Sequence, residues 1–324
     1  MKKLLLILIC NVFTAKAQDV IFSQGFLVPE TISSSFSGAT GQPKTGTLHR
    51  SQWTNYGVKI NSNYVYYDTW FDRYNSGLGA TFLNHQETNS NYSFNQLNLN
   101  YVIAFQISDD WYFRPSISVG FGMKSFGFQN LLLEDQINIS SSTINNSSID
   151  PLTLQSKRTF FDFSSSILFN NENSWIGITL RHLNTPNISL TANGNAPLDV
   201  FLSIHTKYYL PILERGYSWF SSQSKIYLLS NFMMQGVSSR FDIGMQYIFD
   251  DKFSFGMVAG TNPISKSDKK QLFSSINSFV GIKWQSFRFG YSYDFNTTKF
   301  INTGGIHEFS IGYDFGSNIR GFFM

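Results

Sequence analysis

The chain has 324 residues, with 24 Lys and Arg, 21 Asp and Glu, and a formal net charge of +3. Aromatic residues make up 17% of it and charged residues only 14%, well below the roughly one quarter that is typical of soluble domains. Because the two signs of charge are interspersed, the composition excludes the basic footprint of a nucleic-acid-binding protein.

The first residues have the parts of a secretory signal peptide. Two lysines precede an apolar core, and Ala15-Lys16-Ala17 forms a small-x-small cleavage site. We therefore expect a signal peptide at 1–17, with Gln18 as the first mature residue. The sole cysteine, Cys10, follows Ile9, which is too bulky for a lipoprotein cleavage site, so the mature chain is expected to contain no cysteine.

After residue 17, no stretch reaches the roughly 20 apolar residues that a membrane-spanning helix needs. An exported, aromatic-rich chain without such a helix is either a secreted β protein or an outer-membrane β-barrel.

Fourteen segments alternate between apolar and polar side chains, with the period of two that is typical of β-strands. In the segment 287–295, Phe and Tyr occupy every second position, while Arg288, Ser292 and Asp294 share the opposite face. The predicted strands are 46–53, 57–66, 76–84, 92–105, 111–123, 159–169, 174–182, 200–210, 224–234, 238–249, 252–260, 275–284, 287–295 and 306–315.

The lengths of the connections separate the two kinds of β protein. The links 106–110, 170–173, 250–251 and 285–286 are short and follow even-numbered strands, whereas 124–158, 183–199, 261–274 and 296–305 are long and follow odd-numbered ones. Outer-membrane barrels alternate short periplasmic turns with long external loops, and a soluble sandwich has no reason to do so. The link 211–223 is longer than a periplasmic turn should be.

We therefore predict an all-β fold, a single transmembrane antiparallel β-barrel of about 14 strands with both termini periplasmic. The predicted parts are the signal peptide 1–17, an N-terminal periplasmic or lumen-plug segment 18–45, and the outer-membrane barrel 46–324. Pro115 cannot donate to a strand ladder, so a bulge or a strand edge is expected there. The tryptophans at strand ends are expected to form aromatic girdles; they are Trp53, Trp111, Trp175, Trp219 and Trp284.

Both signs of charge are predicted to face the lumen. A selective pore usually carries a ring of one sign, so the mixture favours internal ion pairs and a packed or plugged interior. Gly120 and Gly122 are expected to leave room in that interior. The inward charges are Arg114, Arg181, Arg288, Asp162, Asp242, Asp294, Glu308 and Asp314.

The sequence predicts no catalytic, cofactor-binding or metal-binding residues, no cofactor and no enzymatic activity. The five histidines, His49, His85, His182, His205 and His307, are too far apart in sequence to suggest a shared metal site. Alternation sends His307 to the face opposite Glu308 and Ser310, which argues against a hydrolase at the rim.

Five stretches of the mature chain carry a resemblance to a known family, and among them only the N-terminal QDxxFSQ and the R-x-Q-W are distinctive. The five stretches are QDVIFSQ (18–24), HRSQW (49–53), GLGATFLN (77–84), LNLNYVIAFQISDDWYFRPSISVGFG (97–122) and HEFSIGYDF (307–315). Together they resemble the PorP/SprF proteins of the type IX secretion system. The family usually follows FSQ with an Asn-Pro-Ala-Tyr-Ala-Gly-like turn, where this chain reads SSSFSGATG (33–41). Should that turn dock a partner, this chain is expected to serve a different one.

The resemblance implies an outer-membrane accessory that helps large surface adhesins or other cargo leave through the type IX machinery, in some bacteria to support gliding. The implied partners are the outer-membrane lipid bilayer, type IX secretion components and a large adhesin-type cargo, with no nucleic acid. Two alternatives remain open from the residues alone: a passive, porin-like solute channel and a rim-active hydrolase.

Overall fold

A computed structural model describes residues 19–53, 59–88, 90–127, 132, 134–138, 140–146, 157–191, 194–211, 224–263, 274–297 and 304–316. The predicted signal peptide lies outside these residues, as does Trp219. Within the described residues there is no α-helix, and no helix is long and apolar enough to span a membrane. Short 3-10 helices occur at η1 (Pro29–Thr31), η2 (Ser34–Phe36), η3 (Asp72–Tyr74) and η5 (Glu134–Gln136).

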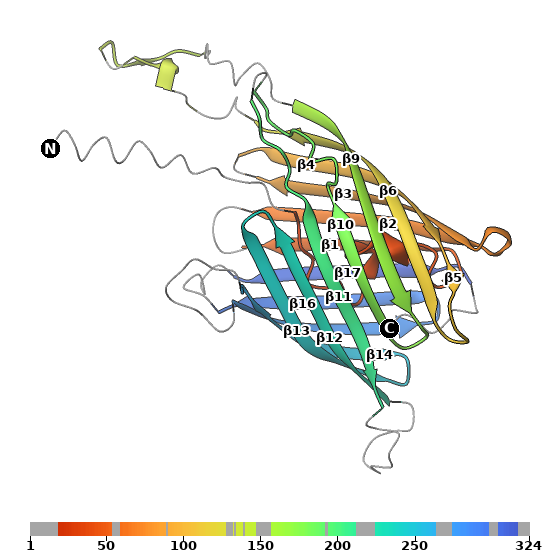
Figure 1. Cartoon of the computed structure of the whole chain (residues 1–324). Helices are drawn as coiled ribbons and strands as arrows, with labels where there is room; N and C mark the ends of the chain where they lie inside the picture. The colour runs from red at the N-terminus through yellow and green to blue at the C-terminus, as the bar shows by residue number, and fades with distance from the viewer. Residues whose placement is uncertain are drawn as a thin grey trace.

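The strands form one closed antiparallel barrel of 14 strands, as predicted (Figure 1). In chain order the wall consists of β1 (Lys44–Gln52), β2 (Ile60–Phe71), β3 (Ser76–Glu87), β4 (Tyr92–Ile103) with its short continuation β5 (Phe105–Gln106), β6 (Tyr112–Ser125), β9 (Lys157–Asn170), β10 (Trp175–Arg181), β11 (Phe201–Leu210), β12 (Ser224–Gln235), β13 (Ser238–Phe249), β14 (Phe253–Thr261), β15 (Ser275–Trp284), β16 (Phe287–Asn296) and β17 (Ile306–Asp314). A separate two-stranded sheet joins β7 (Ile137–Asn138) and β8 (Thr143–Ile144).

The barrel closes where the first strand meets the last. β1 pairs with β17 along its whole length, from Lys44↔Asp314 to Gln52↔Ile306. All 14 predicted strands are found, although β2 is displaced from the predicted 57–66 and runs on to Phe71. Closure leaves no open edge in the wall, which a β structure in lipid requires because its backbone groups must be paired internally.

Of the two alternatives predicted at Pro115, a bulge or a strand edge, the bulge is not formed. The pairing of β4 and β5 with β6 keeps one register, with Val102↔Ser116 before Pro115 and Phe105↔Phe113 beyond it, so no residue is inserted. β4 ends at Ile103, whose partner in that register would be Pro115, a residue with no N–H to donate. The missing N–H of Pro115 therefore interrupts the neighbouring strand β4 and does not bend β6, the strand that contains Pro115.

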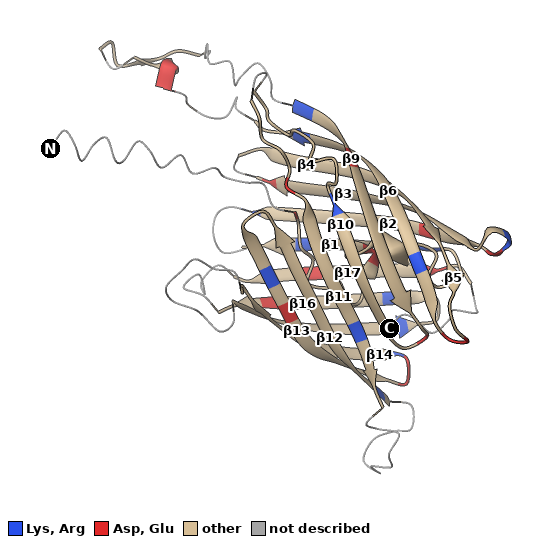
Figure 2. Ribbon diagram, viewed as in Figure 1, with Lys and Arg blue, Asp and Glu red and all other residues tan. Residues whose placement is uncertain are grey.

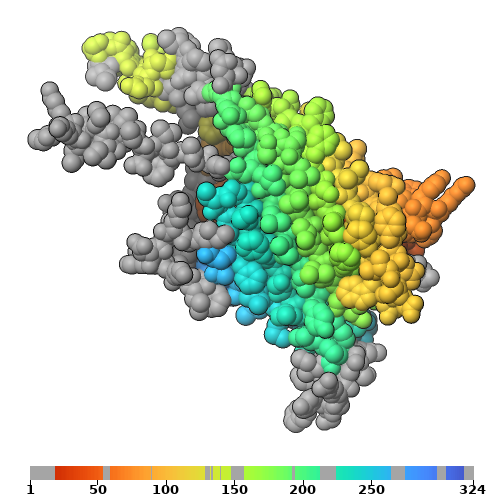
Figure 3. Space-filling model, viewed as in Figure 1, coloured from red at the N-terminus to blue at the C-terminus, as the bar shows by residue number. Residues whose placement is uncertain are grey.

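The outer and inner faces of the wall differ as the alternation predicts. On β16, Phe289 is exposed on the outer face while Ser292 and Asp294 are buried in the lumen. Figure 3 shows an unbroken outer surface across the green and yellow strands. Figure 2 shows few charged residues along these strands. An apolar outer band is what contact with lipid requires.

The charged residues predicted to face inward lie in the lumen, and all but two of them are buried. Arg181 and Arg288 are partly exposed within it. Gly120 and Gly122 also face inward. A Cβ on Gly120 would lie 2.4 Å from Asn98 Oδ1, and one on Gly122 would lie 2.2 Å from the Phe160 ring, so both glycines leave room for neighbouring lumen side chains.

The girdle prediction is wrong for Trp175. Trp284 at the end of β15 is 62% exposed, but Trp175 at the start of β10 is only 2% exposed and points into the lumen. There its ring contacts Phe26 and Phe36 from the segment before β1, with centroids 5.9 and 5.0 Å away. A tryptophan at a strand end is compatible with either face, and here the inner one provides an apolar partner.

The two ends of the barrel differ in their connections. One end, called the long-loop end, carries the connections 126–156, 182–200, 262–274 and 297–305, and also the short links 88–91 and 236–237. The other, called the short-turn end, carries 72–75, 107–111, 171–174, 250–252 and 285–286, and also 211–223. The sequence analysis noted four short links after even-numbered strands and four long links after odd-numbered strands. As predicted, the four short links lie at one end of the barrel and the four long links lie at the other.

Candidate functional site

The segment Asp19–Pro43, which we call the plug, lies inside the barrel and runs the length of the lumen. Its first described residue, Asp19, contacts Arg181 and Gln235 at the long-loop end, and its last leads directly into β1 at the short-turn end. Asp19 and the end of β17 therefore lie at opposite ends of the barrel. The prediction that both termini are periplasmic concerns residues outside the described ones and stays a prediction.

Apolar side chains pack the plug against the wall in the half nearer the short-turn end. Phe26, Ile32 and Phe36 of the plug are buried in one cluster with Trp175 and Phe279 of the wall. Phe36 has no exposed surface. A second buried cluster joins Val28 to the inner faces of β1 and β2. Burial of this much aromatic surface stabilises the plug against the wall at this level.

The turn where this chain departs from the family sequence is part of that packing. Ser35 Oγ lies 2.9 Å from Ser116 Oγ of β6, and Gly38 donates its N–H to Asp68 Oδ1 at 2.8 Å. Gly38 has φ +71° and its Cα faces Gly77, where a Cβ would lie 2.2 Å from Ser37 O. Residues 33–40 are largely buried, so this turn docks on its own barrel wall.

Glu308 of β17 anchors the middle of the plug. Its carboxylate accepts the backbone N–H groups of Ser23 and Gln24, each at 2.9 Å, and lies 3.2 Å from Arg50 Nη1. Arg50 also donates to the carbonyl of Ile21. Glu308 has no exposed surface, so its charge depends on these partners for stabilisation.

A second buried ion pair ties the plug to the start of β1. Lys44 Nζ contacts Glu30 of the plug, and the Asp68 carboxylate of β2 lies 3.8 Å away. Neither Lys44 nor the two acids is more than 7% exposed. Because desolvated charges are costly unless paired, this contact fixes where the plug ends and the wall begins.

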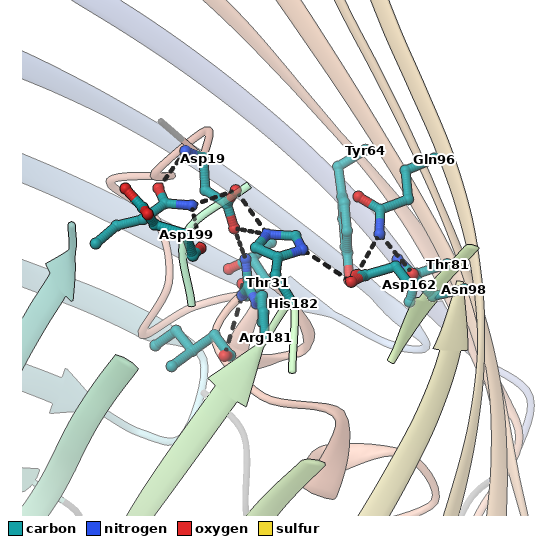
Figure 4. A network of polar contacts seen from close by, with 12 residues as sticks. Asp19, Thr31, Tyr64, Thr81, Gln96, Asn98, Asp162, Arg181, His182 and Asp199 are labelled. Atoms are coloured by element: carbon teal, nitrogen blue, oxygen red, sulfur yellow. Dashed lines mark hydrogen bonds and ion pairs between the residues drawn. The ribbon is translucent and has the colours of Figure 1, made fainter. Parts of the chain in front are cut away.

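At the long-loop end a histidine joins the plug to the wall (Figure 4). His182, which follows β10, lies with Nε2 2.9 Å from Asp19 Oδ1 of the plug and Nδ1 3.0 Å from Asp162 Oδ1 of β9. Asp162 Oδ2 accepts a hydrogen bond from Gln96 of β4 at 2.9 Å. Arg181 lies 3.5 Å from Asp19 and donates to the carbonyls of Thr31 and Ile32.

The charges in this network hold one another in the ionised state. Burial alone would lower the pKa of His182, but Asp19 and Asp162 outweigh it and raise that pKa to about 9. Burial likewise opposes ionisation of Asp19, yet His182 and Arg181 lower its pKa to about 2. At neutral pH His182 is therefore an imidazolium and Asp19 is a carboxylate.

A cavity of about 270 Å³ remains between the plug and the wall of β2, β3, β4, β6, β9 and β10. We call it the lumen cavity. Its residues near the long-loop end include His85, Tyr92 and Ile188, and its inner limit is formed by Thr31 and Ser34 of the plug. The cavity is therefore bounded by the plug on the side of the short-turn end.

The sequence matches a known protein family over most of its length. Residues 14–313 match the type IX secretion system membrane protein family PorP/SprF. The chain belongs to the PorP/SprF family. Family membership and the closed barrel with its apolar outer face together identify an outer-membrane barrel of the type IX secretion family.

No curated protein matches this PorP/SprF chain. Among solved structures, it is similar to the outer-membrane protein Omp33 of Acinetobacter baumannii, with 6% identity, a TM-score of 0.47, and 86% of this chain and 100% of that chain covered. It is also similar to the toluene transporter TbuX of Ralstonia pickettii, with 11% identity, a TM-score of 0.47, and 87% and 91% covered.

Three of the stretches that resemble PorP/SprF sequences meet in the lumen. Asp19, Ser23 and Gln24 come from QDVIFSQ, Arg50 comes from HRSQW, and Glu308 comes from HEFSIGYDF. The sequence analysis predicted no site residue, so the contacts between the plug and the wall are new findings of the structure. The sequence did contain a signal for these contacts, because each stretch has a charged or amide residue that points into the lumen.

Proposed function

We propose that this protein is an accessory of the type IX secretion system that aids the export or surface display of large cargo, such as adhesins of gliding-type machinery. It acts by binding secretion components and cargo, without being the conduit and without enzymatic activity. The observation that carries this proposal is the plug, which is packed against the wall in the half of the lumen nearer the short-turn end.

The dimensions of the barrel support the same reading. Fourteen strands spaced ~4.8 Å apart and tilted ~40° close to a backbone diameter of roughly 28 Å, and inward side chains reduce the free width to roughly 15 Å. A folded domain of 100 residues has a diameter above ~30 Å. Folded cargo would not pass even if the plug left the lumen.

The residues of β17 that the sequence analysis weighed for a hydrolase at the rim do not come together. Among the described residues, Glu308 and Ser310 are buried in the lumen, whereas His307 lies on the outer face with its Nδ1 3.0 Å from Tyr291 Oη. Within the same residues, no group of His, Cys, Asp and Glu has the arrangement of a metal site.

Deletion of the gene tests the proposal. We expect one or a few large proteins to disappear from the surface proteome and accumulate in the periplasm, while other type IX cargo and small-solute uptake stay unchanged. Complementation with the unmodified gene should restore display. Normal display of every secreted protein, together with slowed growth on a limiting sugar, would instead support a solute channel.

A further inference from the structure

The lumen cavity is lined by an unusual row of neutral hydrogen-bonding groups. Gln96, Asn98 and Asn100 occupy successive inward positions of β4, so three primary amides stand side by side on one strand. Hydroxyls from neighbouring strands surround them, namely Thr81, Ser118, Ser164, Ser166 and Thr179. Each primary amide carries two donors and an acceptor oxygen, and each hydroxyl carries both functions.

Contacts within the protein use only part of this hydrogen-bonding capacity. Gln96 Nε2 donates to Asn98 Oδ1 at 3.0 Å, and Asn98 Nδ2 donates to Thr81 Oγ1 at 3.3 Å. Thr179 is only 2% exposed, and its Oγ1 has no hydrogen-bond partner in the part of the chain that the structure describes. A buried hydroxyl left in this state favours a ligand or an ordered water that completes its bonding.

The charges that line the cavity are already paired. Asp19 is bound by His182 and Arg181, Asp162 by His182, and Glu30 by Lys44. A charged ligand would have to compete with these buried pairs, whereas a neutral ligand leaves them intact. The cavity therefore favours a neutral molecule that is rich in donors and acceptors.

Aromatic rings supply the remaining part of the lining. Phe22 of the plug lies 5.7 Å from the Tyr64 ring, and Tyr92 and Phe94 line the cavity from β4. A pyranose sugar presents hydroxyls around its edge and an apolar C–H face, which matches amides and hydroxyls beside aromatic rings. The volume of about 270 Å³ is of the size that a small sugar occupies.

We propose that the lumen cavity binds the pyranose ring of a neutral sugar, with the amide row of β4 holding its hydroxyls and the plug forming the floor. The ring is either a free sugar or the end of a surface polysaccharide chain, since both present the same chemistry. The site adds a ligand to this protein whether or not it assists export.

Saturation-transfer difference NMR on the full-length barrel tests the site. The protein is held in a dimethylamine-oxide detergent, because alkyl glycosides would themselves offer a sugar. The probes are glucose, galactose, mannose and N-acetylglucosamine, and a neutral polysaccharide freed of its lipid. We expect signals from at least one probe, and signals from the polysaccharide alone would identify a chain end as the source.

Variants separate this site from binding elsewhere. Asn98→Leu removes the central amide at nearly constant volume, and Ser164→Phe fills the cavity, so each should weaken binding by about tenfold or more. Asn277→Leu makes the same change on the inner face of β15, away from the cavity lining, and should leave binding unchanged. The unboiled gel mobility of each folded barrel shows whether the variant has folded.

Three results would overturn the proposal. The first is no signal from any probe with the unmodified barrel. The second is a signal that survives both Asn98→Leu and Ser164→Phe in folded protein. The third is an equal loss with Asn277→Leu, because a general effect on the barrel would then explain it. If Asn98→Leu fails to fold, Ser164→Phe alone still decides between the outcomes.

Discussion

Glu308 on the last strand accepts the backbone N–H of Gln24 in the plug at 2.9 Å, although the two residues stand 284 positions apart in the sequence. The same carboxylate accepts the N–H of Ser23 and binds Arg50. The Glu308 side chain thus holds the plug by accepting two of its backbone N–H groups, and it also pairs with the positive charge of Arg50 on the wall.

Replacing Glu308 should loosen the plug. Glu308→Ala removes the acceptor of two N–H groups and the ion-pair partner of Arg50, and losing one partner of a buried pair costs about 3–5 kcal/mol. In planar bilayers we expect the unmodified barrel to be silent and Glu308→Ala to show stepwise conductance.

A matched control for that variant uses an ion pair at the short-turn end. Asp251 is 67% exposed and lies 3.0 Å from Lys225, and exposed pairs contribute little to stability. Asp251→Ala should therefore remain silent. A silent Glu308→Ala barrel would show that the apolar clusters hold the plug without this anchor.

The membrane orientation can be tested on intact cells. External protease should cut within 124–158 or 183–199 at the long-loop end, and not within 106–110 or 170–173 at the short-turn end. The reason is that outer-membrane barrels place their longer loops outside. Cleavage confined to the short turns would reverse the orientation.

Substitutions on the two faces of the wall should differ in cost. Phe289 faces outward on β16, and an arginine there should cost about 2–4 kcal/mol near the midplane. Ser164 borders the lumen cavity, so Ser164→Arg should cost much less. Urea unfolding of the refolded barrel in lipid vesicles measures both, and equal costs would show that β16 does not meet lipid.

The attachment of the plug at the long-loop end should depend on pH. The pKa of His182 is raised by Asp19 and Asp162 to about 9. The stabilisation that His182 gives to the attached plug is therefore complete below the ordinary histidine pKa near 6.5, and it is lost as pH rises through about 9. The pKa of Asp19 is lowered to about 2, so its contribution is present above about 4 and is lost as pH falls toward 2.

Hydrogen exchange of the backbone amides of residues 19–24 measures this dependence. We expect slowest exchange, after correction for the intrinsic rate, between about pH 4 and 6.5, with faster exchange on the alkaline side as His182 loses its proton. His182→Asn should remove the alkaline change. A profile that His182→Asn leaves untouched would assign the pH dependence to another group.

Periodicity predicted the wall well because alternation is a local property of each strand. It placed Asp162, Asp242 and Glu308 on the lumen face from their own neighbours in sequence. It displaced β2, where Tyr64 and Tyr66 face inward and Val65 and Tyr67 face outward, since apolar residues on both faces blur the alternation.

The packing inside the lumen, in contrast, depends on contacts between residues that are far apart in the sequence. Trp175 was assigned to a girdle because nothing in its own strand indicates Phe36, which lies 139 positions earlier in the sequence. Ser292 faces inward as predicted, yet it has no exposed surface, so the room that alternation suggests on the lumen face does not exist there. Contacts with the plug join distant parts of the chain, and a single sequence does not reveal them.

The position of Glu308 on β17 has a consequence for how the barrel assembles. β17 pairs with β1 to close the wall, and the same strand supplies the carboxylate that holds Ser23 and Gln24. Contacts between sequence-distant ends form late because the loop they close is long. We therefore expect closure of the seam and sealing of the pore to be one event, so that insertion never leaves a finished but leaky cylinder in the outer membrane.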